Sequence, residues 1–197
     1  MNFLRKLFSN KLLSSDEKKI HNQEVSLSLD DLFVHNFINN GGKFLYCTSI
    51  SDITSNLIEI LDENQWKNIT CLDEKNLAQF TDSLSIDINF DINKKAPVFT
   101  SCEHIISDSG SILLCSKQIK EKKIHELSND FIVFAKTSQL VKDMNQSLTG
   151  IKNNYKDSLP TNISAIKKFS KENDEENFIS HPISNSKNLY LLLFEDL

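Results

Sequence analysis

The sequence predicts an α/β protein with a mostly parallel sheet covered by helices on both faces. The first observation is that segments of strand composition alternate with segments of helical periodicity along most of the chain. The second is the composition: the 197 residues are 39% hydrophobic and 25% charged, which is ordinary for a globular chain. This length corresponds to one domain that can bury a core of its own.

Several short apolar segments have the composition of strands. The two clearest, Ser111–Ser116 and Phe131–Ala135, are rich in β-forming residues. The other predicted strands are Lys43–Thr48, Asn68–Leu72, Ile86–Ile88, Pro97–Thr100 and Leu189–Phe194.

Between these strands, apolar residues recur at helical spacing. The predicted helices are Leu29–Asn40, Ser51–Leu61, a short helix capped by Asp73, a short helix from Ser101 through Ile106, and Thr137–Leu148. Glycines supply two of the predicted stops, with Gly41-Gly42 after the first helix and Gly150 after the last.

The N-terminal segment Met1–Leu13 has the pattern of a short basic amphipathic helix. Its apolar residues at helical spacing are Phe3, Leu4, Leu7, Phe8, Leu12 and Leu13, and its basic residues are Arg5, Lys6 and Lys11. Such a helix can cover the domain's own core, dock on a partner or make a weak contact with an anionic membrane surface. The polar stretch Ser14–Ser28 is a predicted linker, so the α/β domain is expected over residues 29–197.

The charge and hydropathy exclude some classes of function. A formal net charge of −5 argues against a nucleic-acid binder, which needs a concentrated basic surface. No apolar run approaches the roughly 20 residues that span a bilayer. The N-terminus also lacks the continuous apolar stretch of a signal peptide, so a cytoplasmic location is expected.

The four cysteines do not have the spacing of metal ligands. Cys47, Cys71, Cys102 and Cys115 form no Cys-x-x-Cys pair. All but Cys102 lie in apolar runs, where a cysteine acts as a small buried hydrophobic residue. The sequence therefore predicts free thiols and no metal or other cofactor in this chain.

Other candidates for chemistry are weak. His104 stands beside Glu103 and could act as a general base, or it could be a surface or capping histidine. The acidic run Glu172–Glu176 could bind a cation or form a solvated loop. No Gly-x-Ser-x-Gly elbow, Walker loop or Gly-x-Gly-x-x-Gly occurs, so the serine hydrolase, P-loop NTPase and dinucleotide-binding interpretations lack their main support.

A turn in the middle of the chain carries a resemblance to a known family. Asp108-Ser109-Gly110-Ser111 combines short polar acceptors with a glycine that can adopt positive φ, and by itself it reads as a helix-to-strand connector. The stretch Ile105–Leu114, IISDSGSILL, resembles the A-I-A-E-T-G-T-I-V-L motif of LUD (lactate-utilisation) proteins of the LutC/YkgG type. Asp130–Ala135 resembles their following strand H-I-V-V-V, and Ser138–Met144 their helix I-V-x-x-L. The opening NGGKFLYC is also similar, so the resemblance extends over residues 29–197.

The resemblance implies a Rossmann-like layered fold of the NagB/RpiA/CoA-transferase-like group, with a ligand near the carboxyl ends of the strands. The turn would form one wall of that site, where backbone N–H groups and hydroxyls can bind a small anion. Facing it would be the counterpart of the family's G-P-S-K/R-T-A-D-I-E motif, here KFSKENDEE. The candidate ligand-binding residues are Asp108, Ser109, Gly110, Ser111, Ser170, Lys171 and Asp174.

The C-terminal part departs from the family pattern. The Gly-Pro and Thr-Ala pairs of that motif are missing, and a later G-V-H-G-P motif is replaced by Ile183–Asn188. The catalytic residues are therefore unknown, and activity by the chain alone is not expected.

Three functions stay open. The resemblance implies an accessory component of L-lactate utilisation, in which lactate is oxidised to pyruvate with iron–sulfur partner subunits. The lost motifs favour a non-catalytic binding or regulatory module that kept the fold. A third possibility is an enzyme acting on a small anionic metabolite or CoA ester.

Overall fold

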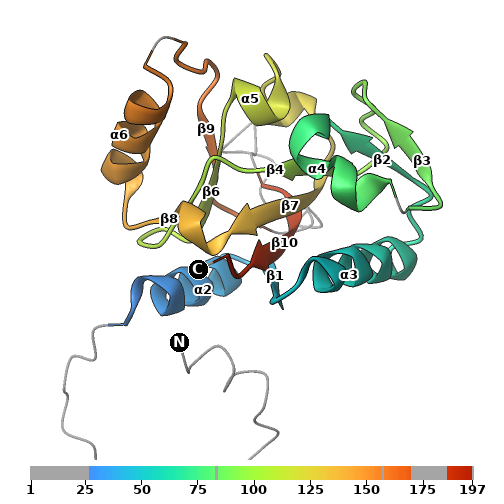
Figure 1. The fold of residues 1–197 in the computed structure, drawn as a ribbon, viewed down its shortest axis with the longest axis horizontal. Coiled ribbons are helices and arrows are strands. Elements are labelled where there is room, and N and C mark those ends of the chain that lie inside the picture. The colour runs from blue at the N-terminus through green and yellow to red at the C-terminus, as the bar shows by residue number, and fades with distance from the viewer. Residues whose placement is uncertain (1–26, 83, 157, 170–185, 197) are drawn as a thin grey trace, which may run out of the picture.

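The computed structural model describes residues 27–82, 84–156, 158–169 and 186–196. Its centre is a parallel six-stranded sheet (Figure 1). In order across the sheet, the strands are β1 (Lys43–Cys47), β10 (Asn188–Phe194), β7 (Asp130–Lys136), β4 (Val98–Ser101), β2 (Asn68–Cys71) and β3 (Asp87–Asn89). The predicted fold class, an α/β layered protein with a mostly parallel sheet, is confirmed.

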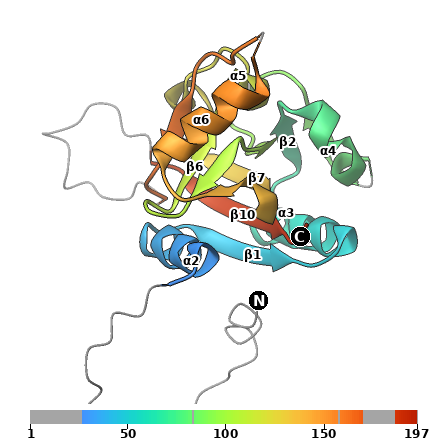
Figure 2. The same ribbon diagram turned by 60° about the vertical axis from the view of Figure 1, so that its left-hand side comes forward.

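Each face of this sheet packs against a different set of elements, because alternate residues of a strand point to opposite faces. On β7, Phe131 and Val133 join a core with α2 (Leu29–Asn39), whereas Ile132 and Phe134 join a core with α3 (Ile50–Glu63) and α4 (Glu74–Thr81). Figure 2 shows α2 and α3 beside β1.

A second, four-stranded sheet lies over the face that α2 also covers. Its strands, in order, are β8 (Leu140–Val141), β5 (His104–Ile106), β6 (Ser111–Leu114) and β9 (Ser164–Ile166). The remaining elements are α5 (Ser116–Ile119), α6 (Met144–Asn154) and the 3-10 turns η1 (Ile124–Glu126) and η2 (Thr137–Gln139). Ile105 and Ile112 from this sheet are fully buried in the shared core.

In this region one predicted helix is wrong and another begins later than predicted. The segment from Ser101 through Ile106 is the end of β4 followed by strand β5, because the turn at Gly110 folds it into an antiparallel hairpin in which Ile106 pairs with Ser111. The helix predicted from Thr137 begins only at Met144.

The late start of α6 has a local cause. Leu140–Val141 pairs with β5 as strand β8, and the side chain of Asp143 then caps the helix by accepting from the backbone N–H of Gln146. Gly150 does not end this helix, which continues to Asn154.

The other predicted elements are found within a few residues of their expected bounds. Residues 1–13 and nearly all of the predicted linker lie outside the described residues. Ser28 is described, and its side chain caps α2 by accepting from the backbone N–H of Asp31. Within the described ranges, no helix is both long and apolar enough to cross a membrane.

All four cysteines are free, as the sequence predicts. The three in apolar runs are buried as expected, and Cys102 is buried as well. Burial raises the pKa of each thiol, to about 11 for Cys71 and for Cys115. Nearby carboxylates, such as Asp73 beside Cys71, add to the effect.

We expect these raised pKa values to make the protein sensitive to alkali. Thiols of the unfolded chain lose their protons near their ordinary pKa of 9.0, while the folded thiols keep theirs. The unfolded state then binds fewer protons, so the free energy of unfolding falls as pH rises from about 9 towards 11. Urea denaturation across this range checks the slope, which should be shallower in a Cys71→Ala/Cys115→Ala variant. An identical slope in that variant would contradict this origin.

Candidate functional site

A cleft of about 770 Å³ opens at the carboxyl ends of β2, β4 and β7. After β2 the chain enters α4 on one face of the sheet, whereas after β4 it enters the second sheet on the other face. Neighbouring parallel strands whose connections leave to opposite faces create a crevice, and ligands of α/β proteins bind in such crevices. The cleft therefore occupies the expected place for a ligand.

A buried carboxylate and hydroxyl pair sits between β2 and β4. Ser101, the last residue of β4, donates its hydroxyl hydrogen bond to Asp73, which follows β2. Asn76 donates to both carboxylate oxygens of Asp73, at 2.9 Å each. Asp73 stands at the predicted cap position of α4, yet its side chain makes no capping bond to the helix. Its carboxylate instead orients Ser101 at the cleft.

Glu103 provides a second buried carboxylate, with 8% of its surface exposed. One oxygen, Oε2, accepts from Gln118 Nε2 at 3.1 Å, from the Tyr155 hydroxyl at 3.1 Å and from Cys115 Sγ at 3.6 Å. The other oxygen, Oε1, has no hydrogen-bond donor among the described residues and is not sealed from solvent. Oε1 is thus available to a donor group of a ligand.

His104 lines the same cleft, although not in the helix that the sequence predicted. Its Nδ1 lies 2.9 Å from the Ser147 hydroxyl, and its ring packs against Gly150 of α6. Burial lowers the pKa of His104, and the charge of Glu103 partly opposes that shift. The two adjacent side chains have separate partners, so the structure does not pair them as acid and base.

Lysines supply positive charge around these carboxylates. Lys75 from α4 and Lys136 from the end of β7 are exposed residues of the cleft lining. Gln139 also lines the cleft, and its side chain donates to the backbone carbonyl oxygen of Cys102 at 2.6 Å. The lining thus combines buried acceptors with exposed cations.

The predicted turn Asp108–Ser111 lies at the other end of the β5–β6 hairpin and is not part of the cleft lining. It packs on α2, where Asn36 donates to the carbonyl oxygen of Ser107 at 2.8 Å and Asn40 to that of Ser109 at 2.8 Å. The hydroxyls of Ser109 and Ser111 are 2.6 Å apart. Ser170, Lys171 and Asp174 lie outside the described residues, so the predicted approach of that segment to the turn stays a prediction.

Comparison with known proteins agrees with this architecture. The profile of the LUD domain family matches residues 31–194. The chain belongs to the LUD domain family. A DUF162 family protein from Deinococcus radiodurans has a similar crystal structure, with a TM-score of 0.59 and 13% sequence identity over 86% of this chain and 99% of the other. None of the curated proteins matches this chain.

The described part of this LUD domain offers no set of three or more His, Cys, Asp or Glu side chains placed to hold a metal ion. Asp73 and Glu103 belong instead to separate hydrogen-bond networks.

The sequence did contain a signal for the cleft. Asp73 follows one predicted strand directly, and Ser101 and Glu103 closely follow another. Polar residues at the carboxyl ends of parallel strands meet at one edge of a sheet.

Proposed function

We propose that this LUD domain binds a small hydroxylated anion in the cleft. The supporting observation is the arrangement of charges at the switch point between β2 and β4. Glu103 Oε1 can accept a hydrogen bond from a ligand hydroxyl, and Lys75 and Lys136 can attract a ligand carboxylate. A 2-hydroxy acid carries both groups on adjacent carbons.

L-lactate is such an acid, which makes the chain a candidate accessory component of L-lactate oxidation to pyruvate. In that role the domain binds lactate or pyruvate beside iron–sulfur partner subunits, and the electrons pass to clusters on those partners. The buried, dispersed cysteines of this chain do not fit a cluster of their own.

The size of the cleft favours a second candidate. A volume of about 770 Å³ is in the range of sites for ligands far larger than a three-carbon acid. A CoA ester or another extended anion fits such a space, with its phosphates near the lysines and its acyl end near Glu103. A non-catalytic module with a protein partner is the third candidate, supported by the lost C-terminal motifs.

A thermal-shift experiment separates these candidates. The full chain is heated with L-lactate, pyruvate, inorganic phosphate, CoA or acetyl-CoA, and a ligand selective for the folded state raises the melting temperature. At a concentration of 100 Kd the stabilisation is about 2.7 kcal/mol. We expect Lys75→Ala to lose most of this ligand-induced shift while its own stability changes by less than about 0.5 kcal/mol.

Lys94→Ala is the matched control, because Lys94 is exposed and does not line the cleft. Equal stabilisation of the wild type and the Lys75→Ala variant would remove the cleft as the site. The same ligand would then be tested with Lys171→Ala, which examines the predicted site at the Asp108–Ser111 turn. If no probe stabilises the wild type, the partner-module candidate replaces both ligand candidates.

A further inference from the structure

The surface formed by α2 and α3 beside β1 is acidic. Helix α2 contributes two acidic residues and α3 four, and neither contains a lysine or an arginine; they are Asp30, Asp31, Asp52, Glu59, Asp62 and Glu63. Figures 1 and 2 place both helices on the same side of the molecule, next to β1 at the edge of the sheet. We call this surface the acidic face.

The acidic face has charged and apolar groups free for a partner. Glu59, Asp62 and Glu63 are exposed, and none forms an ion pair with another described residue. The same two helices also expose apolar side chains: Ile58 on α3 is 41% exposed and Ile38 on α2 is 51% exposed. A binding partner suited to this surface therefore presents cationic and apolar groups together on the side that contacts it.

We propose that the acidic face holds the chain's own N-terminal segment, Met1–Leu13. That segment contains Arg5, Lys6 and Lys11 and no acidic residue, and six large apolar residues recur in it at helical spacing. The positive charge of the segment and its large apolar residues thus complement the acidic face. A second copy of the face is a poorer partner, because two such surfaces repel each other.

The length of the N-terminal segment and the reach of its linker also suit this contact. A 13-residue helix is about 20 Å long, and the 14-residue α3 is about 21 Å long. The predicted linker, Ser14–Ser28, spans about 21 Å on average if it is a flexible coil, and it joins α2 directly. Such a tether provides an effective concentration in the millimolar range, so even a weak contact is populated.

Paramagnetic relaxation enhancement tests the contact in the full chain. The introduced thiol of Ser9→Cys accepts a nitroxide label selectively, because the four native cysteines are buried. We expect broadening of amide resonances in α2 and α3, and its loss in a Glu59→Lys/Asp62→Lys variant. It should also weaken near 1 M salt, where the Debye length is about 3 Å.

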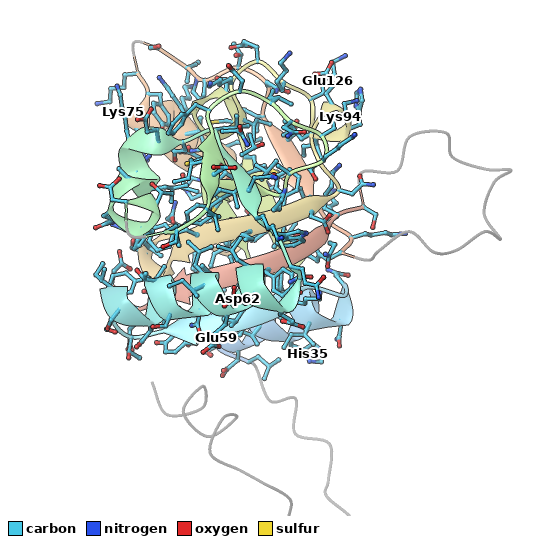
Figure 3. All side chains as sticks on the ribbon, turned by 90° about the vertical axis from the view of Figure 1, so that its right-hand side faces the viewer. His35, Glu59, Asp62, Lys75, Lys94 and Glu126 are labelled. Carbon is cyan, nitrogen blue, oxygen red and sulfur yellow. The ribbon has the colours of Figure 1, made fainter. Side chains whose placement is uncertain are left out.

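Lys94→Glu is the control for a charge change elsewhere, since Figure 3 shows Lys94 at the end of the molecule opposite Glu59. This variant should keep the broadening. Broadening that appears only when labelled and isotope-enriched chains are mixed would overturn the intramolecular contact, as would broadening that survives charge reversal of the face. Absence of broadening together with binding of the full chain to phosphatidylglycerol vesicles would assign the segment to a membrane surface instead.

Discussion

Replacing Gly110 with alanine is expected to destabilise the domain by roughly 3 kcal/mol or more. Gly110 has a φ of +59°, which side chains rarely tolerate. A Cβ atom at this position would lie 2.4 Å from the backbone nitrogen of Phe37 and 2.5 Å from the carbonyl carbon of Asn36. Relief requires α2 to move, yet Phe37 is fully buried in the core. Urea denaturation followed by circular dichroism measures the loss.

Ser109→Ala is the matched control within the same turn. It removes only the contact between the hydroxyls of Ser109 and Ser111, and we expect a loss of about 1 kcal/mol. A Gly110→Ala variant as stable as this control would mean that the hairpin does not press against α2. The result would also bear on the predicted turn site, because a turn so tightly covered by α2 leaves little room for a ligand at Gly110.

Most strands of the sheet could be predicted because they are buried on both faces and therefore appear as short apolar runs. The order of the strands across the sheet could not be predicted. β10 comes last in the chain but lies between β1 and β7, where Leu191 pairs with Phe44 on one side and Val133 on the other. The middle residues of β1, β7 and β10 are all apolar, so the local sequence pattern does not specify which of these strands are neighbours.

The same ambiguity explains the missed second sheet. A short apolar run such as Ile105-Ile106 fits a helix or a strand equally well, and only its pairing with β6 and β8 decides between them. If the β5 segment is a helix, the Asp108–Ser111 turn is predicted near the carboxyl ends of the large sheet. In the β5–β6 hairpin, the turn instead lies against α2, and Glu103 lies at the cleft.

Glu103 lines the cleft and accepts hydrogen bonds from residues that are distant in the sequence, so no local sequence pattern predicts these contacts. Its partners Gln118 and Tyr155 come from α5 and from the end of α6, and both donate to the same carboxylate oxygen. Burial raises the pKa of Tyr155 to about 12, and the charge of Glu103 contributes to the rise because a carboxylate disfavours a neighbouring phenolate.

Replacing Glu103 with alanine is expected to lower the free energy of unfolding by about 2–3 kcal/mol, because it leaves buried donors without an acceptor. Glu103→Gln keeps the size of the side chain, removes its charge and replaces one acceptor oxygen by an amide NH2 donor. Its remaining oxygen can still accept from Gln118 and Tyr155, so we expect a smaller loss of stability. In both variants the pKa of Tyr155 should fall part of the way towards its ordinary value of 10.0, since burial remains. Titration of the tyrosinate absorbance, with Tyr155→Phe to identify the signal, measures this shift.

The Glu103→Gln variant should also lose the stabilisation by any ligand whose hydroxyl donates to Oε1. An unchanged Tyr155 titration in Glu103→Gln would show that the two groups are not coupled. Retained ligand stabilisation would show that the carboxylate does not contact the ligand.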